Sequence, residues 1–428
     1  MTTTKNNEHK KLNFLSEREQ SQACLNSAEH EKNQGRKVLN VPNLRFKEFQ
    51  GEWEKTKIGD IAIVVGGGTP DTNTSQYWNG KIQWFTPSEI GRNKYVYNSV
   101  RTISEEGLNK SSAKLLPIGT ILLSSRATVG ECSINKKECT TNQGFQSLIP
   151  KENISNEFVY YLIQTKRKDL IRKSCGSTFL EISANEVRKI VVSIPTIKEQ
   201  DKIAKLLSLL DDRIATQNKI IEDLKKLKSA IIEEHYKKVE KRSVLVSELG
   251  EPFNVGNLSK EDLTATGTPC VLYGELFTTY GATINHVESH TNKSDGITLS
   301  KKGDLLFPSS TTVDAVSLIA PSVINVDDVI LGGDMFGIHI NSDFNAQYLS
   351  YFFNHITKSQ FAKYAKGSTI IHLHYKDIAK AKLSLPCLEG QNRIAKCLVF
   401  LDDKIAIEST LSDLLNSQKI YLLCQMFI

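Results

Sequence analysis

The longest regular pattern of apolar positions lies between residues 198 and 238, a stretch of 41 residues without Pro or Gly. Apolar side chains recur there at seven-residue spacing in two columns, which predicts one long α-helix with an apolar seam. At about 1.5 Å per residue the helix would be about 60 Å long, which suits a spacer. A similar pattern follows Pro386. The expected seam residues are Ile203, Leu210, Ile220, Leu224, Ile394, Leu401, Leu411 and Leu415.

Polar residues interrupt both seams at the same two places. The first seam contains Arg213 and Gln217, and the second contains Lys404 and Glu408. Polar residues that are buried in a helical seam can fix its register and the orientation of its partner. A seam that frays or is solvated at these places would give the same pattern, so the sequence leaves both interpretations open.

The remaining sequence contains short apolar and β-branched runs separated by Gly, Asn and Ser, which is typical of strands. Pro195 and Pro386 mark the points where two globular portions end and the long helices begin. The pattern therefore predicts an α+β fold in which each globular portion is followed by a long helix. Strands are expected at 61–65, 120–124, 190–194, 304–307 and 329–331, and amphipathic helices at 156–173 and 346–366.

An internal repeat relates the two portions. The 40 residues from Gly176 match the 40 residues from Gly367 without a gap, and 16 of the 40 positions are identical. Fainter matches extend upstream, where 119–129 resembles 303–313. We also expect Phe145 to correspond to Phe336 and Tyr160 to Tyr351, at the same offset of 191 residues. Each half thus has a variable front portion and a better-matched back portion.

The formal charge of +6 is unevenly distributed. Residues 1–242 contain 40 Lys and Arg against 29 Asp and Glu, whereas residues 243–428 contain 14 against 19. Basic residues concentrate at 166–173 and at 358–382, around equivalent positions of the repeat. Local clusters of this kind attract nucleic-acid phosphates. A solvated helix face is the alternative interpretation for either cluster taken alone.

Other features exclude several classes of protein. No window approaches the length of apolar sequence that a membrane-spanning helix needs, and residues 1–10 lack the apolar core of a secretory signal. We therefore expect a cytoplasmic protein without a membrane partner. The eight cysteines include no Cys-x-x-Cys pair, which argues against a zinc cage or a disulfide framework. Residues 1–40 are polar and are expected to form a frayed helix or a disordered extension.

The sequence shows no catalytic constellation. The glycine run at 66–70 lacks the lysine of a phosphate-binding loop, so it predicts a tight turn. His286 with His290, and His372 with His374, have no carboxylate or cysteine partner at the spacing of a metal site. The sequence therefore predicts neither a metal site nor a catalytic residue.

A set of short motifs accompanies the two globular portions and their helices. These are VPNLRF at 41–46 with GEW at 51–53, GGTP at 67–70 with YWNG at 77–80 and WFT at 84–86, LLSSRA at 122–127, and TNQGF at 141–145. Together they resemble the specificity subunit of type I restriction-modification enzymes, over about residues 41–428. The chain departs from that pattern in its long front extension. It also departs in its acidic segment 243–350, which contains 4 Lys and Arg against 13 Asp and Glu.

The resemblance implies two pseudo-repeated target-recognition domains separated by two long antiparallel coiled-coil helices. The expected divisions are 1–40 for the extension, 41–195 for the first domain, 196–242 for the first spacer helix, 243–386 for the second domain and 387–428 for the second spacer helix. The implied partners are double-stranded DNA with a bipartite, asymmetric target, two methyltransferase subunits, and restriction and translocase subunits. The chain would have no chemistry and no cofactor of its own. S-adenosylmethionine, Mg and ATP would be bound by the partner subunits.

Within this interpretation, phosphate contacts provide affinity and salt dependence without reading sequence. They are expected from Lys166, Arg167, Arg172, Lys173, Ser177, Thr178, Lys363, Lys366, Ser368 and Thr369. Bases are read by side chains that can donate and accept hydrogen bonds in pairs. The candidates are Arg92, Asn93, Lys94, Asn142, Gln143, Tyr273, Thr278, Thr279 and Tyr280. Asn142, Gln143 and Arg126 lie in motifs of the family, so a structural role is an equal alternative for them.

Two other function classes stay open. A coiled-coil scaffold with two protein-binding heads would use its lysines only for solubility and would lack salt-dependent, sequence-selective DNA affinity. A single-chain nuclease or methyltransferase would act without partners, but the motifs that such an enzyme needs are missing.

Overall fold

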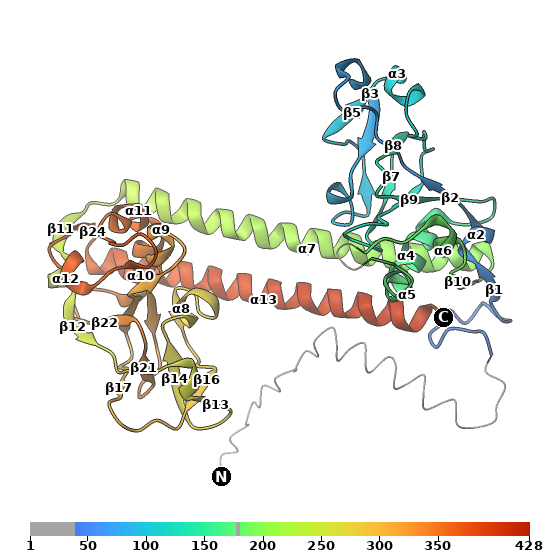
Figure 1. Cartoon of the computed structure of the whole chain (residues 1–428). Coiled ribbons are helices and arrows are strands. Elements are labelled where there is room, and N and C mark those ends of the chain that lie inside the picture. The colour runs from blue at the N-terminus through green and yellow to red at the C-terminus, as the bar shows by residue number, and fades with distance from the viewer. Residues whose placement is uncertain (1–38, 177–179) are drawn as a thin grey trace, which may run out of the picture. The chain divides into compact units, whose positions relative to one another are not determined.

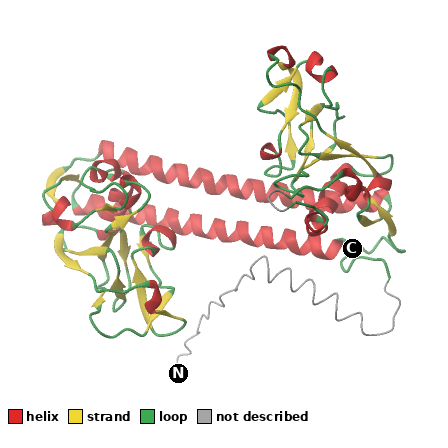
Figure 2. Ribbon diagram, viewed as in Figure 1, coloured by secondary structure: helices red, strands yellow, loops and turns green. Residues whose placement is uncertain are grey.

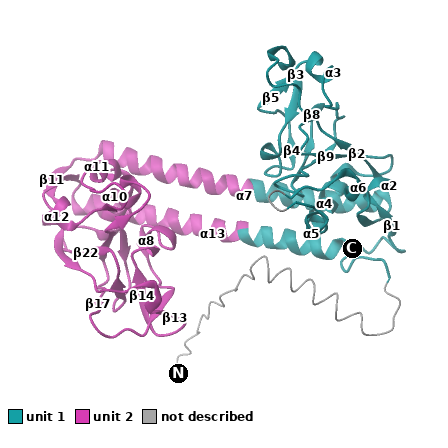
Figure 3. Ribbon diagram, in the orientation of Figure 1, with its two compact units in different colours: residues 1–215, 413–428 teal, residues 216–412 magenta. Residues whose placement is uncertain are grey.

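The computed structural model describes residues 39–176 and 180–428, so Ser177, Thr178 and residues 1–38 of the expected extension lie outside the described residues. The chain divides into two compact units (Figure 3). Unit 1 contains residues up to 215 together with 413–428, and unit 2 contains residues 216–412. Both boundaries fall within the long helices, so each unit contains one globular domain and a segment of each long helix. None of the helices in the described ranges is long and apolar enough to cross a membrane.

Unit 1 alternates short strands with short helices (Figures 1 and 2). Its elements are β1 (Glu54–Lys57), α2 (Ile58–Ile61), β2 (Ala62–Gly66), η2 (Ser75–Tyr77), β3 (Trp78–Phe85), η3 (Pro87–Glu89), β4 (Tyr95–Val96), β5 (Arg101–Ile103), α3 (Glu105–Asn109), β6 (Ile121–Leu123), β7 (Cys132–Asn135), β8 (Cys139–Thr141), β9 (Gln146–Pro150), α4 (Asn156–Thr165), α5 (Arg167–Arg172), α6 (Ala184–Arg188) and β10 (Val191–Ile194). The long helix α7 (Ile197–Lys238) follows and continues into unit 2.

The core of unit 1 is a five-stranded mixed sheet in the order β2-β9-β6-β7-β4. Its central strand β6 places Ile121 opposite Leu148 of β9 and Ile134 of β7, and all three side chains are fully buried. Helix α4 packs against β6, β7 and β9 and contributes Phe158 and Tyr161 to the same core. A smaller sheet in the order β5-β3-β8 extends from this core. A separate pair of strands, β1 and β10, leads into α7.

Unit 2 repeats this succession with more strands. Its elements are β11 (Arg242–Leu245), η4 (Val246–Glu248), β12 (Gly250–Asn254), η5 (Lys260–Asp262), β13 (Leu263–Thr264), β14 (Thr268–Leu272), α8 (Glu275–Thr278), β15 (Thr283–Ile284), β16 (Ser289–Thr291), β17 (Thr298–Leu299), β18 (Asp304–Pro308), β19 (Ser310–Thr311), α9 (Ala315–Leu318), β20 (Ser322–Ile324), β21 (Ile330–Gly332), β22 (Met335–Ile340), α10 (Ala346–His355), α11 (Lys358–Ala362), β23 (Ile371–His372), α12 (Tyr375–Ile378) and β24 (Lys382–Leu385). The second long helix is α13 (Leu388–Met426), which continues into unit 1.

The main sheets of the two units have the same topology. The sheet of unit 2 has the order β12-β22-β18-β20-β15, and Leu305 at its centre pairs with Ile338 and Val323 as Ile121 does with its partners. In both sheets the last strand runs parallel to its neighbour and the other pairs are antiparallel. The structure therefore confirms the expected α+β fold with two pseudo-repeated domains.

The second sheets differ. Both contain a parallel pair, β3 with β8 in unit 1 and β14 with β21 in unit 2, and both flank it with an antiparallel strand. Unit 2 adds the edge strands β13 and β17 and reaches five strands, whereas the second sheet of unit 1 has three. This divergence falls in the front portions, where the two halves of the sequence cannot be aligned.

Two expected helices are each broken once. The segment 156–173 forms α4 and α5, separated by Lys166, where φ is −94° and ψ is 7°. The segment 346–366 forms α10 and α11, separated by Ile356 and Thr357. Each break turns the chain so that the second helix buries an apolar residue, Leu170 in α5 and Phe361 in α11. The apolar spacing continues across the break, which hid it in the sequence.

These breaks also correct the upstream part of the repeat alignment. The helices α4 and α10 begin at residues 156 and 346, an offset of 190, so the counterpart of Tyr351 is Tyr161 and not Tyr160. The sheet registers likewise align Gln146, and not Phe145, with Phe336. The offset becomes 191 afterwards because one residue links α4 to α5 and two residues link α10 to α11.

Candidate nucleic-acid interface

Each unit attaches its domain to both long helices through a Tyr, Asp and Lys cluster. In unit 1, Tyr161 of α4 donates a 2.6 Å hydrogen bond to Asp211 of α7. The Nζ atom of Lys419 on α13 lies 2.7 Å from the other carboxylate oxygen of Asp211. Burial and the hydrogen bond to this carboxylate raise the pKa of Tyr161 above the ordinary tyrosine value. The cluster therefore joins a domain helix, the helix that follows it and a segment of the other long helix.

Unit 2 contains the same cluster with the two long helices exchanged. Tyr351 of α10 donates a 2.6 Å hydrogen bond to Asp402 of α13, and Lys228 of α7 lies 2.5 Å from the other oxygen of that carboxylate. Each aspartate and each lysine lies 191 residues from its counterpart in the other cluster. The two aspartates are among the identical positions of the repeat, but the sequence alone indicates no role for them. Their partners lie on other elements, so the repeat was the only available signal.

A second repeated contact fixes the start of each long helix. Gln200 is almost fully buried, donates to the carbonyl oxygen of Pro195 and accepts from the main-chain N–H of Ser155, which caps α4. Gln391 makes the same two bonds to Pro386 and Asn345, the cap of α10. The identical glutamines of the repeat thus tie the domain helix to the turn that precedes the long helix.

The helix seam is largely apolar but contains polar contacts in unit 2, one of which joins Gln217 to Glu408. Gln217 donates to the main-chain oxygen of Glu408 at 3.0 Å and to its carboxylate, and the two residues are 6% and 9% exposed. They occupy equivalent positions of the repeat, so equivalent residues meet, as in an antiparallel helix pair. Solvation of the seam is therefore wrong for Gln217 and Glu408. Arg213 and Lys404 are exposed, and solvation applies to them.

Most of the expected seam residues lie in the seam. Ile203, Leu210, Ile394, Leu401 and Leu415 are buried, and Leu224 and Leu411 are partly buried. Ile220 is 40% exposed, so its assignment to the seam is wrong. A strict seven-residue column drifts around an α-helix of 3.6 residues per turn, and Ile220 has drifted out of the contact face.

The first family motif closes unit 1 around the end of α13. The guanidinium of Arg45 makes two hydrogen bonds, of 2.7 and 2.8 Å, to the carboxylate of Glu199, which is 1% exposed. The indole of Trp53 donates to the same carboxylate. The ring of Trp53 also packs edge-on against Phe427, which stacks on Phe158. The motif at 41–53 therefore holds structure together through Arg45 and Trp53.

Several loops of unit 1 meet at the hairpin between β6 and β7. The N–H of Ser125 donates to Gly144, and the N–H of Ile182 donates to Ser125. These two bonds bring the hairpin beside the loop that contains Asn142 and Gln143. Asn142 accepts from the N–H of Gly144 and so stabilises its own turn, whereas Gln143 is exposed and accepts a 2.6 Å hydrogen bond from Thr69.

The basic cluster of unit 1 is largely matched by carboxylates. Arg172 lies 2.8 Å from Asp169, and Lys173 lies 3.6 Å from Glu186. Arg167 is half exposed and lies 2.9 Å from Glu131 at the end of the hairpin. Lys166 is directed elsewhere, because its Nζ donates a 2.8 Å hydrogen bond to the main-chain oxygen of Ile428 and burial lowers its pKa. The structure therefore contradicts a phosphate role for Lys166 in this conformation.

The equivalent cluster of unit 2 is more exposed. Lys363 is exposed, and Lys366 is exposed although its Nζ lies 2.5 Å from Asp377. Main-chain hydrogen bonds in both directions join Lys366 to His372. Ser368 and Thr369 are exposed in the loop that this pair closes. This loop remains the candidate phosphate contact of unit 2.

The structure corrects one base-reading candidate of unit 1. The Lys94 side chain is 8% exposed, lies 2.7 Å from Glu157, and donates to Tyr161 and Ser208. Lys94 therefore stabilises the junction of α4 and α7, and the proposal that it reads bases is wrong for this conformation. Its neighbours Arg92 and Asn93 are exposed. The sequence around Lys94 did not indicate its burial, because the groups that bind it lie on α4 and α7.

The candidates of unit 2 divide in the same way. Thr278 and Thr279 are exposed at the end of α8. Tyr273 and Tyr280 pack against the core of the second sheet, the hydroxyl of Tyr280 accepts from the N–H of Glu288, and burial raises the pKa of Tyr280. Because the two tyrosine rings are packed, Thr278 and Thr279 are the more accessible base-reading candidates of unit 2.

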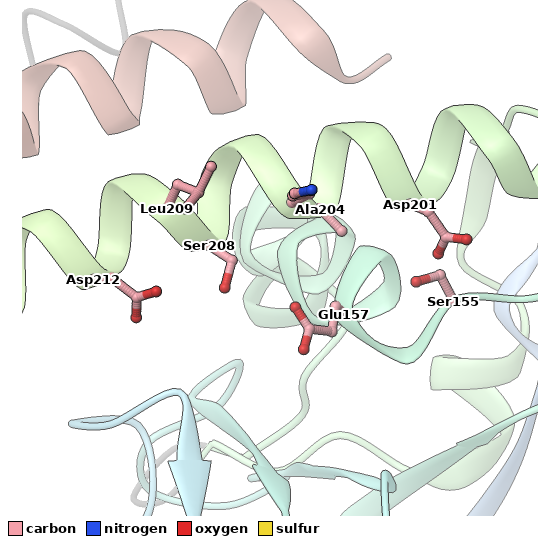
Figure 4. A pocket seen from close by; sticks show the side chains of 8 residues that line it. Ser155, Glu157, Asp201, Ala204, Ser208, Leu209 and Asp212 are labelled. Atoms are coloured by element: carbon pink, nitrogen blue, oxygen red, sulfur yellow. The ribbon is translucent and has the colours of Figure 1, made fainter.

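No metal site emerges from the described part of the chain, which contains no group of three or more His, Cys, Asp or Glu that could hold an ion. Unit 1 has a pocket of about 230 Å³ between α4 and α7. Figure 4 shows the side chains of Glu157, Ser208 and Asp212 on its walls. Asp201 adds a third carboxylate, against one cation from Lys205. An acidic lining of this kind repels phosphates, so the pocket lies outside the candidate interface.

Comparison with known proteins agrees with this architecture. A family model described as "Type I restriction modification DNA specificity domain" matches residues 50–226 and 244–417. The type I restriction enzyme MjaIX specificity subunit of Methanocaldococcus jannaschii is 41% identical over 180 residues, which cover 41% of this chain and 42% of that protein. The EcoR124I/EcoR124II specificity subunit of Escherichia coli is 33% identical over 175 residues, which cover 39% of this chain and 43% of that protein. The matches thus span less than half the length of these two relatives.

The fold also matches a solved structure. The crystal structure of the type I restriction-modification system S subunit from M. genitalium superimposes with a TM-score of 0.58 at 15% sequence identity. That superposition covers 91% of this chain and 99% of the solved chain. The two matches to the family model cover both globular domains and most of both long helices. This chain therefore belongs to the family of type I restriction modification DNA specificity domains.

Proposed function

We propose that the chain is the DNA sequence-specificity subunit of a type I restriction-modification complex. Its two domains are target-recognition domains, and each reads one half of a bipartite, asymmetric target in double-stranded DNA. The single observation that carries this proposal is the pair of reciprocal Tyr-Asp-Lys clusters, at Asp211 and at Asp402. Two domains that are attached in the same way but differ in their second sheets suit a protein that reads two different half-sites in a fixed arrangement.

The long helices serve as the spacer in this proposal. We expect two such readers to recognise half-sites about one helical turn of DNA apart, roughly 34 Å. The similar halves offer two similar surfaces, which suits two copies of a methyltransferase subunit, and restriction and translocase subunits join through them. The names of the relatives, specificity subunits of type I restriction enzymes, support this assembly.

The chain supplies recognition and no chemistry in this complex. S-adenosylmethionine, Mg and ATP belong to the partner subunits. The side chains of Gln143, Arg92 and Asn93 in unit 1, and of Thr278 and Thr279 in unit 2, are exposed and suited to contacts with base edges. The exposed basic residues of α5 and of the loop after Lys363 provide the phosphate contacts.

The test is to co-express the chain with a type I methyltransferase subunit and to map adenine methylation across the host genome. The methyltransferase subunit alone is the control. The proposal expects one bipartite motif that appears only when the chain is present. A complex that assembles and binds S-adenosylmethionine but methylates no motif would instead support a scaffold with two protein-binding heads.

A further inference from the structure

The hairpin between β6 and β7 of unit 1, residues 124–131, contributes one residue to each of two arginine and glutamate pairs. The guanidinium of Arg126 at its tip makes three hydrogen bonds of 2.7 to 3.1 Å to the carboxylate of Glu181. Glu131 at its end lies 2.9 Å from the guanidinium of Arg167 on α5. The basic cluster and the hairpin therefore form one surface, on which each arginine holds a carboxylate.

Both pairs lie at the surface. The side chains of Arg126 and Glu181 are each 43% exposed, and those of Arg167 and Glu131 are 53% and 30% exposed. Ion pairs in such positions contribute little to stability, because water competes for both charges. Stability of the fold is thus a weak explanation for a hairpin with this arrangement.

Unit 2 has a longer connection between β18 and β20, which contains β19 and α9, and it lacks such a pair at the position of Arg126. The strand bridge between Arg126 and Glu181 has its counterpart in the bridge between Ser310 and His372. The hydroxyl of Ser310 donates a 2.7 Å hydrogen bond to Asp334. Unlike Arg126, Ser310 carries no positive charge. The same strand bridge therefore forms with an uncharged residue at the position of Arg126.

The backbone at the tip is strained in unit 1. Ala127 adopts φ of +62°, in the left-handed region that residues with a side chain rarely occupy. Such strain costs of order 1 kcal/mol or more and is kept where the surrounding structure or a function requires it. Arg126 directly precedes this residue, and the neighbouring loop presents the exposed Gln143.

We propose that Arg126 is a phosphate-contacting residue and that Glu181 is its competitor within the chain. Without DNA, Arg126 is bound to the carboxylate, and on DNA it moves to a backbone phosphate, which offers the same bidentate geometry as a carboxylate. Glu131 holds Arg167 in the same way. This inference rests on the proposed function, since it assigns residues to DNA binding by unit 1.

The two carboxylates have a consequence for affinity. Each phosphate contact must displace an internal ion pair, and each displaced carboxylate stays near the DNA and repels it. Contact with phosphates is then weaker than the count of arginines suggests, and this weakening is independent of DNA sequence. The hairpin of unit 2, with Ser310, has no such charge to exchange.

The experiment uses the full chain in complex with methyltransferase subunits and measures equilibrium binding to double-stranded DNA with and without the target, at several salt concentrations. Glu181→Gln should raise the affinity for both DNAs about two- to five-fold at low salt. Arg126→Gln should lower the affinity for both and reduce the slope of log K against log salt by about one. In the Arg126→Gln background, Glu181→Gln should have a smaller effect than it has alone. The control is Glu222→Gln, which removes an exposed carboxylate from α7, where it pairs with Lys226, and should leave DNA affinity unchanged.

Thermal unfolding of the variants separates this role from a structural one. The inference expects melting temperatures close to that of the unsubstituted complex. It is overturned if Glu181→Gln leaves DNA affinity unchanged, or if Glu181→Gln has the same effect with and without Arg126. A complex that contains the unsubstituted chain and does not bind DNA at all would overturn the proposed function, and this inference with it.

Discussion

The two halves of the molecule share the contacts that attach each domain to the long helices, and they differ in the second sheet of each domain. Both build the same five-stranded sheet, the same glutamine contact at the start of a long helix, and the same Tyr-Asp-Lys cluster. They differ in the second sheet, which has three strands in unit 1 and five in unit 2, and in the charge of the hairpin at Arg126 and Ser310. The contacts that attach a domain to the long helices are thus shared, whereas the parts of the domain that are proposed to read DNA differ.

The same comparison distinguishes the polar interiors of the two units. Unit 1 buries Lys94 between Glu157 and Ser208, whereas the sheet register places Ala282 at the equivalent position of unit 2. The counterpart of Glu157 is Gln347, which donates a 2.6 Å hydrogen bond to Thr283. Unit 1 therefore uses an ion pair where unit 2 uses a neutral contact. The attachment tolerates either chemistry as long as the polar groups are satisfied.

The largest expected effect concerns Lys94. Lys94→Met removes the cation of a largely buried pair and leaves Glu157 without it, so unit 1 should lose about 3 kcal/mol of stability. Arg92→Ala, two residues away and exposed, should change stability by less than about 0.5 kcal/mol. Denaturant unfolding, with hydrogen exchange to locate the change in unit 1, measures the difference. A stable Lys94→Met variant with weaker DNA binding would restore Lys94 as a reader of bases.

The next largest loss of stability is expected for substitutions of Gln200 and Gln391. Gln200→Leu and Gln391→Leu each leave a main-chain N–H and a proline carbonyl without their buried partners, at a cost of about 2 kcal/mol each. Because the geometry is the same in both units, the two losses should be similar. Hydrogen exchange should report each loss in the helix that the glutamine caps, α4 or α10. Strongly unequal losses would show that the repeated contact has different importance in the two halves.

A smaller effect is expected for the two aspartates. Asp211→Asn and Asp402→Asn keep the shape of the side chain but remove the charge that holds Lys419 or Lys228. The side chain of Asp211 is 19% exposed and that of Asp402 is 38% exposed. Asp211→Asn should therefore cost about 1 kcal/mol and Asp402→Asn about half as much, because water screens the more exposed pair. Equal costs, or a larger cost for Asp402→Asn in denaturant unfolding, would contradict this ranking.

The smallest effect is a difference in acid sensitivity. Burial lowers the pKa of His235 and His355, and nearby cations lower both further. The unfolded chain therefore binds these protons first as the pH falls below about 6.5, and unit 2 loses stability from that pH downward until the folded histidines titrate as well. Residues 39–215 and 413–428 contain no histidine.

Unit 1 should respond to acid only at lower pH. Burial raises the pKa of Glu157, but the hydrogen bonds from Lys94 and Tyr95 outweigh it, so the pKa is lowered overall. The stability that Glu157 contributes is present above about pH 4.3 and is lost as the pH falls further through its folded pKa. Hydrogen exchange at pH 7 and pH 5.5 should show weaker protection at the lower pH in unit 2 and no change in unit 1. The double variant His235→Gln, His355→Gln should remove that change, and its persistence would point to other groups.

The sequence predicted the parts of the fold that leave a pattern along the chain. Apolar spacing located both long helices, and the repeat located two similar domains before their sheets were known. It also marked Gln200 and Asp211 as equivalent to Gln391 and Asp402. Their partners could not be inferred, because Ser155, Tyr161 and Lys419 lie on other elements and the repeat does not show which residues meet in space.

The candidate interface was harder to predict for a related reason. Lys94 and Arg92 look alike in sequence, and only the packing of α4 against α7 buries one and exposes the other. Arg126 was recognisable as part of a motif, but its partner Glu181 lies 55 residues away. Charge clusters counted along the chain do not show which cations are already held by carboxylates, as Arg167 is by Glu131.

The most direct test of the two-reader account replaces the reading part of unit 1 with that of unit 2. Residues 250–381 would be inserted in place of residues 62–190, which keeps β1, β10 and the long helix α7 and supplies Tyr351 in place of Tyr161 to meet Asp211. The variant would be co-expressed with the methyltransferase subunit and its methylation motif mapped across the genome. The account predicts a bipartite motif whose two halves are the same sequence in inverted orientation, one of them being a half of the original target. A variant complex that methylates the original asymmetric motif, or a motif that contains neither original half, would contradict the claim that each domain reads its own half-site.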